Sequence, residues 1–299
     1  MLDTNFELYK IFYVTAKCGN ITLAAQRLFL TQPSVTKYIQ KLEQHLGCAL
    51  FVRSKRGVTL TAEGRMLMSR IEPACQLILS GERELSSRQA LESGTISIVS
   101  TEMSFKSYVL PTMENFLHRH PGIRVRFANA LNEQMVEMLS NGGVDIAILH
   151  EPFRREDFMD IRVIEEMDEY AVCGRPFIGL SKRVNSPGDL ISLPFISMPE
   201  GSSTMEYLTQ YFARFGLEFK PDIELTTVEL TAQAVEGGLG IGILPKRIAE
   251  PRIRSGSIFR VPVDPVLPKR KACLITNSLL PPGIAAQVFA DELLSKNQG

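Results

Sequence analysis

The sequence has no tryptophan, four histidines and five cysteines among its 299 residues, and these shortages exclude several kinds of site. The cysteines are scattered, odd in number and form no CxxC pair, so we expect free thiols. A redox-sensing pair is the weaker alternative, because nothing in the sequence places two cysteines together. His118 and His120 stand two residues apart on an expected helix and point to different faces, which is not the spacing of metal ligands.

Long hydrophobic runs and catalytic motifs are also missing. No uninterrupted apolar run approaches the roughly 20 residues that a membrane-spanning helix needs. The N-terminus has no basic segment followed by an apolar core, so we expect no signal peptide and a cytoplasmic location. The glycine run at 237–242 follows an expected helix and leads into an expected strand, the reverse of a dinucleotide-binding turn. With no P-loop, GxSxG or HExxH motif, we expect no enzyme, no cofactor and no metal.

The charge is balanced overall but unevenly distributed. The chain has 33 basic and 33 acidic side chains, yet residues 1–60 hold eight Lys and Arg against three acids, a net charge of +5. The remainder therefore carries −5. A basic head on an acidic body fits a local DNA-contact surface.

Residues 20–46 predict two helices joined by a tight turn. Thr31 is the expected N-cap of the second helix, and Pro33 is tolerated in its first turn. Apolar residues spaced by four, three and four share one expected buried face: Val35, Ile39, Leu42 and Leu46. The opposite face offers groups that can read base edges or meet phosphates: Gln32, Ser34, Thr36, Lys37, Gln40 and Lys41. Two ordinary helices of a bundle are the alternative interpretation.

Residues 50–60 predict two short strands around a basic turn, a wing. Arg53 and Arg56 would reach phosphates or the neighbouring minor groove. Thr61 then caps a long helix in which small or apolar residues recur at heptad spacing: Leu67, Ile71, Ala74, Ile78, Gly81 and Leu85. This spacing predicts that two such helices pair; a helix packed on its own domain is the alternative. Pro73 lies inside the helix and should kink it or remove one hydrogen bond, and residues 92–94 are expected to form a hinge.

The head resembles the DNA-binding domain of LysR-type transcriptional regulators, in the family's order and spacing without a gap. The matching residues include Ala24-Ala25, Thr31-Gln32-Pro33, Leu42-Glu43, Leu50-Phe51 and Leu60-Thr61. Thr36 stands where the family usually has serine, and Lys37 where arginine is also common. Both keep a hydroxyl and a cation, so only the preferred DNA sequence is affected.

From residue 95 onward strands and helices alternate, which predicts parallel sheets with helices on both faces. The stretches 144–148 and 235–245 resemble the effector domain of the same family, a two-lobed α/β fold like that of periplasmic solute-binding proteins. The resemblance implies a winged helix-turn-helix domain at 1–60 and a linker and dimerisation helix with hinge at 61–93. It also implies effector lobe one at 94–167 plus 268–299 and lobe two at 168–267, with crossings near 166–169 and 263–269.

Ligands of open parallel sheets bind beyond the carboxyl ends of the strands, where helix N-termini point. That rule predicts an effector site from residues at those ends: Ser100, Thr101, Leu131, Leu149, His150, Ser202, Ser203, Thr204, Thr227 and Val228. Nearby carboxylates would oppose a highly charged anion, so a neutral, amino-bearing or singly charged ligand stays open: Glu102, Glu151, Glu200 and Glu229. For any single Ser or Thr, a simple helix-capping role is the alternative.

These patterns together predict a sequence-specific, DNA-binding transcriptional regulator. By resemblance, it would bind an interrupted inverted repeat of double-stranded DNA as a homo-oligomer, a dimer through the linker helix and a tetramer through the effector domains. A small-molecule effector would change the shape of that oligomer and the access of RNA polymerase. Gln32, Pro33, Ser34, Thr36 and Lys37 would touch bases and backbone. A solute-binding protein built on the same two-lobed body, or an enzyme on that body, are the alternatives.

Overall fold

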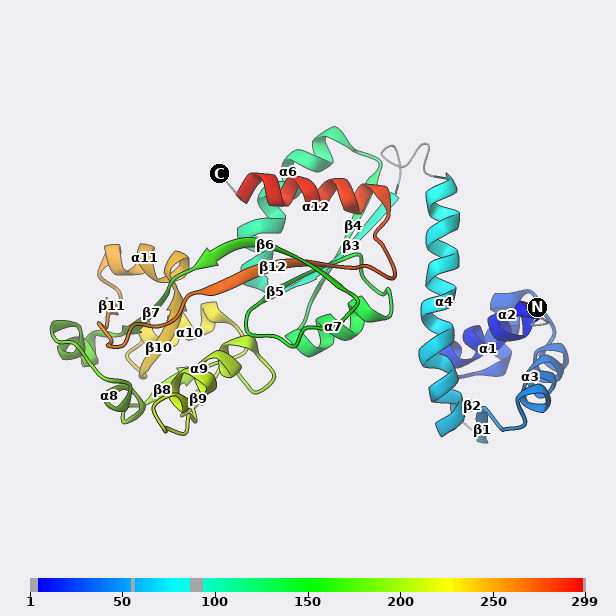
Figure 1. Cartoon of the computed structure of the whole chain (residues 1–299), viewed down its shortest axis with the longest axis horizontal. Coiled ribbons are helices and arrows are strands. Elements are labelled where there is room, and N and C mark those ends of the chain that lie inside the picture. Colours follow the sequence, from blue (N-terminus) through cyan, green and yellow to red (C-terminus); the bar gives the residue numbers. More distant parts are fainter. Residues whose placement is uncertain (1–4, 55–56, 87–93, 298–299) are drawn as a thin grey trace. The chain divides into compact units, whose positions relative to one another are not determined.

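The computed structural model describes residues 5–54, 57–86 and 94–297 of the chain (Figure 1). The chain divides into two compact units, Met1–Leu85 and Ser86–Gly299, which we call the head and the effector unit. The expected hinge at 92–94 lies, apart from its last residue, outside the described residues.

The head is a helix-turn-helix with a two-stranded wing and one long helix. Its elements are α1 (Phe6–Cys18), α2 (Ile21–Leu28), α3 (Gln32–Leu46), β1 (Phe51–Ser54), β2 (Gly57–Leu60) and α4 (Ala62–Ser86). The Asn20 side chain caps α2 by accepting hydrogen bonds from the N–H groups of Thr22 (2.8 Å) and Leu23 (3.1 Å). Ala24 and Ala25 are buried, as close packing of the two helix backbones requires. The predicted helix pair and wing are confirmed.

Two expectations for the head's helices need correction. Leu46 was expected on the buried face of α3, but it is exposed, because the last turn runs past the core. In α4, Leu67 and Ile71 pack against the head's own core, whereas Ile78 is 55% exposed. The first part of the heptad series is therefore used within the head. The helix continues through Pro73.

The effector unit contains two five-stranded sheets, each with helices packed on it (Figure 1). The first lobe contains β3 (Gly94–Ser100), α5 (Glu102–Ser104), a π-helical turn (Phe105–Val109), α6 (Leu110–Arg119), β4 (Ile123–Asn129), α7 (Asn132–Ser140), β5 (Ile146–His150), β6 (Met159–Met167), β12 (Arg270–Asn277) and α12 (Ile284–Asn297). The second contains β7 (Glu169–Cys173), a 3-10 helix (Arg175–Lys182), α8 (Pro187–Ile191), β8 (Phe195–Ser197), α9 (Ser203–Ala213), β9 (Ile223–Glu224), α10 (Val228–Glu236), β10 (Ile241–Pro245), α11 (Lys246–Ser255) and β11 (Phe259–Arg260).

The sheets are mixed, whereas the alternation of strands and helices predicted parallel ones. Their strand orders are β4-β3-β5-β12-β6 and β11-β7-β10-β8-β9. β12 runs antiparallel to both β5 and β6, and β7 runs antiparallel to β10. The cause is the double crossing: the chain leaves the first sheet at the end of β6, enters the second as β7, and returns through β12. Each strand beside a crossing therefore opposes its neighbours.

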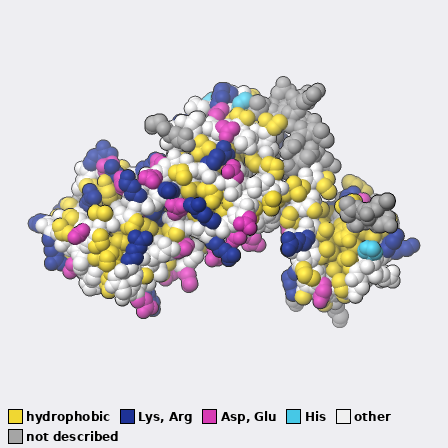
Figure 2. Space-filling view, viewed as in Figure 1, with side chains coloured by type: hydrophobic (Ala, Val, Ile, Leu, Met, Phe, Trp, Pro, Cys, Tyr) yellow, Lys and Arg dark blue, Asp and Glu magenta, His cyan; other side chains and the backbone are white. Residues whose placement is uncertain are grey.

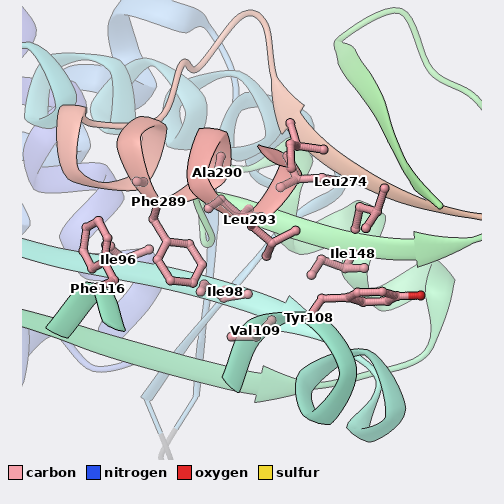
Figure 3. Close-up of a cluster of buried hydrophobic side chains, with 14 of the residues drawn as sticks. Ile96, Ile98, Tyr108, Val109, Phe116, Ile148, Leu274, Phe289, Ala290 and Leu293 are labelled. Carbon is pink, nitrogen blue, oxygen red and sulfur yellow. The ribbon is translucent and has the colours of Figure 1, made fainter. Parts of the chain in front are cut away.

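The core of the first lobe is built around α12, which lies across one face of the sheet (Figure 3). Phe289 and Leu293 point from this helix toward Ile98 and Ile148 of the central strands, and all four side chains are fully buried. Phe289 meets Phe116 of α6 edge to face, with ring centres 5.2 Å apart. This packing holds the carboxyl ends of β3 and β5 in place at the edge of the sheet that faces the second lobe.

Candidate functional site

The first candidate site is the outer face of α3 in the head. Gln32, Pro33 and Lys37 are exposed on it, while Ser34 and Thr36 are half-buried. The Thr31 hydroxyl oxygen accepts a hydrogen bond from the Ser34 N–H (3.4 Å), and the two hydroxyls lie 2.8 Å apart. The first turn of the helix is thus held by its own cap, with an amide and an ammonium group presented to solvent.

The wing lies next to α3 in the sequence and is tied to it by a carboxylate. Glu43 accepts hydrogen bonds from the N–H groups of Leu50 (2.7 Å) and Phe51 (3.3 Å). The carboxylate of Glu43, in the last turns of α3, is therefore engaged by backbone N–H groups of the head itself. Arg53 is placed by its backbone in β1, paired with Val58, and Arg56 lies outside the described residues.

The second candidate site is a cavity of about 320 Å³ between the two lobes of the effector unit. Eight of the ten residues predicted for the effector line it: Thr101, Leu131, His150, Ser202, Ser203, Thr204, Thr227 and Val228. Ser100 and Leu149 do not. Both are completely or almost completely buried, Ser100 inside β3 and Leu149 among the apolar side chains behind β5. Leu149 alternates with His150 along β5 and therefore points to the opposite face of the sheet, while the buried Ser100 hydroxyl donates a hydrogen bond to the Thr101 carbonyl oxygen (3.0 Å).

Four helices begin at this cavity, two from each lobe. Their N-cap residues are Thr101 for α5, Leu131 for α7, Ser202 for α9 and Thr227 for α10. The three hydroxyl oxygens accept hydrogen bonds from N–H groups in their own helices, so the capping role is real. Helix N-termini also carry partial positive charge, and four of them at one cavity favour a ligand with an acceptor or negative group.

Arg270, at the start of β12, is a buried cation of the cavity wall that sequence reasoning missed. Its Nε donates to the Glu151 carbonyl oxygen (2.7 Å), its Nη2 to Ser203 Oγ (2.8 Å), and its Nη1 to Thr204 Oγ1 (3.3 Å). Nη1 also pairs with Glu169 Oε1 at 3.2 Å. Arg270 therefore joins the loop after β5 in lobe one to α9 and β7 in lobe two.

Burial controls the titration of the groups around Arg270. It raises the pKa of Glu169 to about 7, although the charge and hydrogen bond of Arg270 oppose this shift. Burial also lowers the pKa of His150 to about 3, and the charge of Arg270 adds to that effect. His150 is thus a neutral imidazole at physiological pH, with Nε2 3.4 Å from Ser104 Oγ.

The carboxylates expected near the site fall into two groups. Glu102 and Glu229 line the cavity, and each is paired, Glu102 with Lys106 at 2.7 Å and Glu229 with Arg252. Glu151 and Glu200 do not line it. With both wall carboxylates neutralised by cations, the cavity opposes an anionic ligand less than the sequence predicted.

Other lining residues also escaped sequence reasoning. Three methionines from separate segments form much of the apolar wall, Met103, Met167 and Met198, and Asn129, Asn132 and Gln134 add amides. Methionine side chains adapt to irregular ligands. The amides follow β4 at the predicted carboxyl end, so the rule that identified Leu131 could also have identified them.

Within the described ranges, no group of three or more His, Cys, Asp and Glu side chains could hold a metal ion. The described helices also include none that is long and apolar enough to cross a membrane. On the face of the effector unit that Figure 2 shows, basic and acidic side chains are interspersed.

Comparison with known families identifies both units. Residues 6–65 match the model of the bacterial regulatory helix-turn-helix protein, lysR family, and residues 89–298 match the LysR substrate binding domain. The chain belongs to the LysR family of transcriptional regulators. It is therefore a DNA-binding regulator with an effector-binding domain, not an enzyme, and the match at 6–65 sets the solute-binding alternative aside.

Curated relatives of this LysR-type regulator match along nearly the whole chain. A probable RuBisCO transcriptional regulator of Trichormus variabilis is 28% identical over 98% of this chain and 89% of its own length. The RuBisCO operon transcriptional regulator of Allochromatium vinosum is 26% identical over 96% and 94%.

Solved structures show the same fold. Full-length CbnR complexed with its target DNA has a TM-score of 0.62 at 22% identity, over 98% of this chain and 100% of that one. A full-length OxyR variant from Pseudomonas aeruginosa has a TM-score of 0.69 at 18% identity, over 96% and 97%. The predicted family and fold class are confirmed.

Proposed function

We propose that this regulator reads DNA with the outer face of α3. Gln32, Pro33, Ser34, Thr36 and Lys37 contact bases and backbone in the major groove, and Arg53 and Arg56 of the wing contact the flanking phosphates. The support is the exposure of the amide and ammonium groups and the occupation of Glu43 by backbone N–H groups. A face without a free carboxylate suits the phosphate backbone.

Two heads act together in this proposal. The exposed apolar residues of α4, Leu77, Ile78 and Leu79, pair with those of a second copy to form a dimer, and effector units join two dimers into a tetramer. Paired heads related by symmetry read an interrupted inverted repeat. Because the regulated DNA of a bacterium lies in the cytoplasm, we propose that location for the protein and RNA polymerase as a further partner.

A small molecule in the inter-lobe cavity controls this assembly. The observation that carries the proposal is the meeting of four helix N-termini, two from each lobe, around one cavity of about 320 Å³. A ligand held by residues of both lobes, Thr101 and His150 on one side and Ser202 to Thr204 and Thr227 on the other, favours one lobe arrangement over another. The ligand is neutral or carries a single charge, with an apolar body for the methionine wall.

The first test is the selection of bound fragments from sheared genomic DNA by the purified full-length protein, followed by footprinting. Recovery of an interrupted inverted repeat supports the proposal. If the recovered fragments share no sequence, whether the selection is run without or with candidate metabolites, specific DNA reading by α3 is contradicted.

A Lys37→Ala variant tests the proposed reading face on the recovered site. Loss of one phosphate contact should weaken binding and lower the slope of log affinity against log salt by about 0.9. Lys10→Ala removes an exposed lysine from α1 and serves as the control. Equal affinity and slope for Lys37→Ala and wild type would place the DNA on another face.

A further inference from the structure

A second hollow lies beside the effector cavity and has a similar volume, about 320 Å³. Its walls come from the end of α9, the segment leading into β12 and the loop after β5, including Tyr207, Tyr211, Arg214, Lys269 and Glu151. Arg270 lines both hollows and stands between them. The second hollow is therefore a separate space that shares one buried side chain with the first.

The charges around the second hollow are mostly positive. Arg214, Lys269 and Arg270 face Glu151, which is itself paired with Arg155 at 3.0 Å. Arg270 is engaged by Glu169, and Lys269 Nζ lies 3.6 Å from Asp168 Oδ1. Arg214 is exposed, and no carboxylate in the described part of the chain pairs with it. Its guanidinium is thus free to bind an anion from solvent, with up to two parallel hydrogen bonds.

Two tyrosines of α9 lie behind the surface of the hollow, and each is fixed by a hydrogen bond. The Tyr207 hydroxyl donates to the Pro268 carbonyl oxygen and the Tyr211 hydroxyl to that of Pro265, both at 2.8 Å. Tyr207 also lies under the guanidinium of Arg270, 5.0 Å from its ring centre. Both residues are almost wholly buried, Tyr207 6% and Tyr211 2% exposed, so the apolar surface open to a ligand comes from the half-buried Pro152, Phe153 and Pro268.

We propose that this second hollow is a binding site for a small organic anion, whose carboxylate or phosphate head meets Arg214 and Lys269 and whose apolar body lies along Pro152, Phe153 and Pro268. Its volume reaches the range of small-molecule sites. The hollow is open, so the ligand exchanges with solvent without a movement of the lobes. This site is distinct from the inter-lobe cavity and does not require the proposed effector site to be correct.

Fluorine NMR on the full-length protein tests the site with defined probes. 4-Fluorophenyl phosphate and 4-fluorobenzoate carry the two kinds of anionic head, and neutral 4-fluorobenzyl alcohol serves as the uncharged control. Arg214→Gln and Lys269→Gln each remove one cation of the second hollow. Arg254→Gln removes an exposed arginine of α11 and is the matched charge control, while Lys106→Gln reports on the inter-lobe cavity. Circular dichroism verifies that each variant is folded.

We expect saturable binding of at least one anion, and binding of the alcohol that is at least tenfold weaker. Arg214→Gln should weaken anion binding on the order of tenfold or more, and Lys269→Gln less, because its ammonium is also near Asp168. Arg254→Gln and Lys106→Gln should leave binding unchanged. Which of the two anions binds more tightly identifies the head group. No saturable binding up to about 10 mM, or weakening by Lys106→Gln but not by Arg214→Gln, would overturn the proposal.

Discussion

Replacing Glu169 by glutamine should change how the stability of this protein depends on pH. Glu169 is 1% exposed in its side chain, and burial raises its pKa from the ordinary 4.5 to about 7. Between these values the folded state holds a proton that the unfolded state has released, so stability falls as pH rises from 4.5 to 7. This pKa shift lowers the free energy of unfolding of the wild-type protein by about 2.5 kcal/mol between about pH 5 and about pH 8.

Glutamine cannot titrate, so the variant lacks this loss. It has a separate cost, because an amide replaces the protonated carboxyl beside Arg270, about 0.5–1.5 kcal/mol for one altered hydrogen bond. That cost is nearly the same at both pH values. The free energy of unfolding of Glu169→Gln, relative to that of wild type, should therefore be about 2.5 kcal/mol more favourable to the variant at about pH 8 than at about pH 5.

The assay is urea unfolding followed by far-ultraviolet circular dichroism, since the chain has no tryptophan. Glu200→Gln, at an exposed position of lobe two, makes the same chemical replacement without removing a buried carboxyl group. Parallel curves of stability against pH for Glu169→Gln and wild type would refute the reasoning, because they would show that Glu169 does not take up a proton on folding.

Three further changes have defined outcomes. His150→Gln should act in the opposite direction. Burial lowers the pKa of His150 to about 3, so the wild-type protein loses stability as the pH falls below 6.5. Between about pH 7.5 and pH 4.5, the free energy of unfolding of the variant should rise relative to that of wild type by about 3 kcal/mol in the same unfolding assay. An unchanged pH dependence would show that the imidazole is charged in the fold. Phe289→Ala should destabilise the effector unit by about 3–5 kcal/mol, because it empties a fully buried site in the core of lobe one, and a loss below about 1 kcal/mol would contradict that packing. Ile78→Asp in α4 should convert the oligomer to smaller species in analytical ultracentrifugation, whereas Ser69→Asp on the same helix should not; an intact oligomer would place the pairing surface elsewhere.

Local pattern was enough to predict most elements of this fold, and it failed where distant segments or proline intervened. The helix pair, the wing and α10 follow from caps and periodicity within a few residues. α11 was missed because Pro245 and Pro251 flank and enter it, although Pro245 stands at the N-terminal boundary, where its missing N–H costs nothing. The mixed first sheet depends on β12 returning beside β5 and β6, more than 100 residues after them, which no local pattern shows.

The residues of the candidate effector site also fall into those that local pattern predicted and those that it missed. The rule that ligands bind at the carboxyl ends of strands identified residues whose position follows from their own strand and helix, such as Thr101 and Thr227. It extended too far into the strands at Leu149, which alternates with His150 and points away from the cavity, and at Ser100, whose buried hydroxyl is bonded to the Thr101 carbonyl oxygen. Arg270 was not found, because its partners Glu169 and Ser203 are 101 and 67 residues away, and only the double crossing brings them together.

The position of Arg270 gives the two hollows a physical connection. Arg270 donates hydrogen bonds to the hydroxyls of Ser203 and Thr204 at the start of α9. A ligand in the inter-lobe cavity that binds these hydroxyls would compete with Arg270 for them. A ligand in the second hollow meets the same guanidinium from the side of Glu151 and Tyr207. Any shift of Arg270 also changes the environment of Glu169 at the first crossing strand. Where both ligands alter the hydrogen bonds of Arg270, linkage requires each ligand to change the other's affinity by the same factor. Under our two proposals, Arg270 is therefore the side chain through which occupancy of one hollow affects the other.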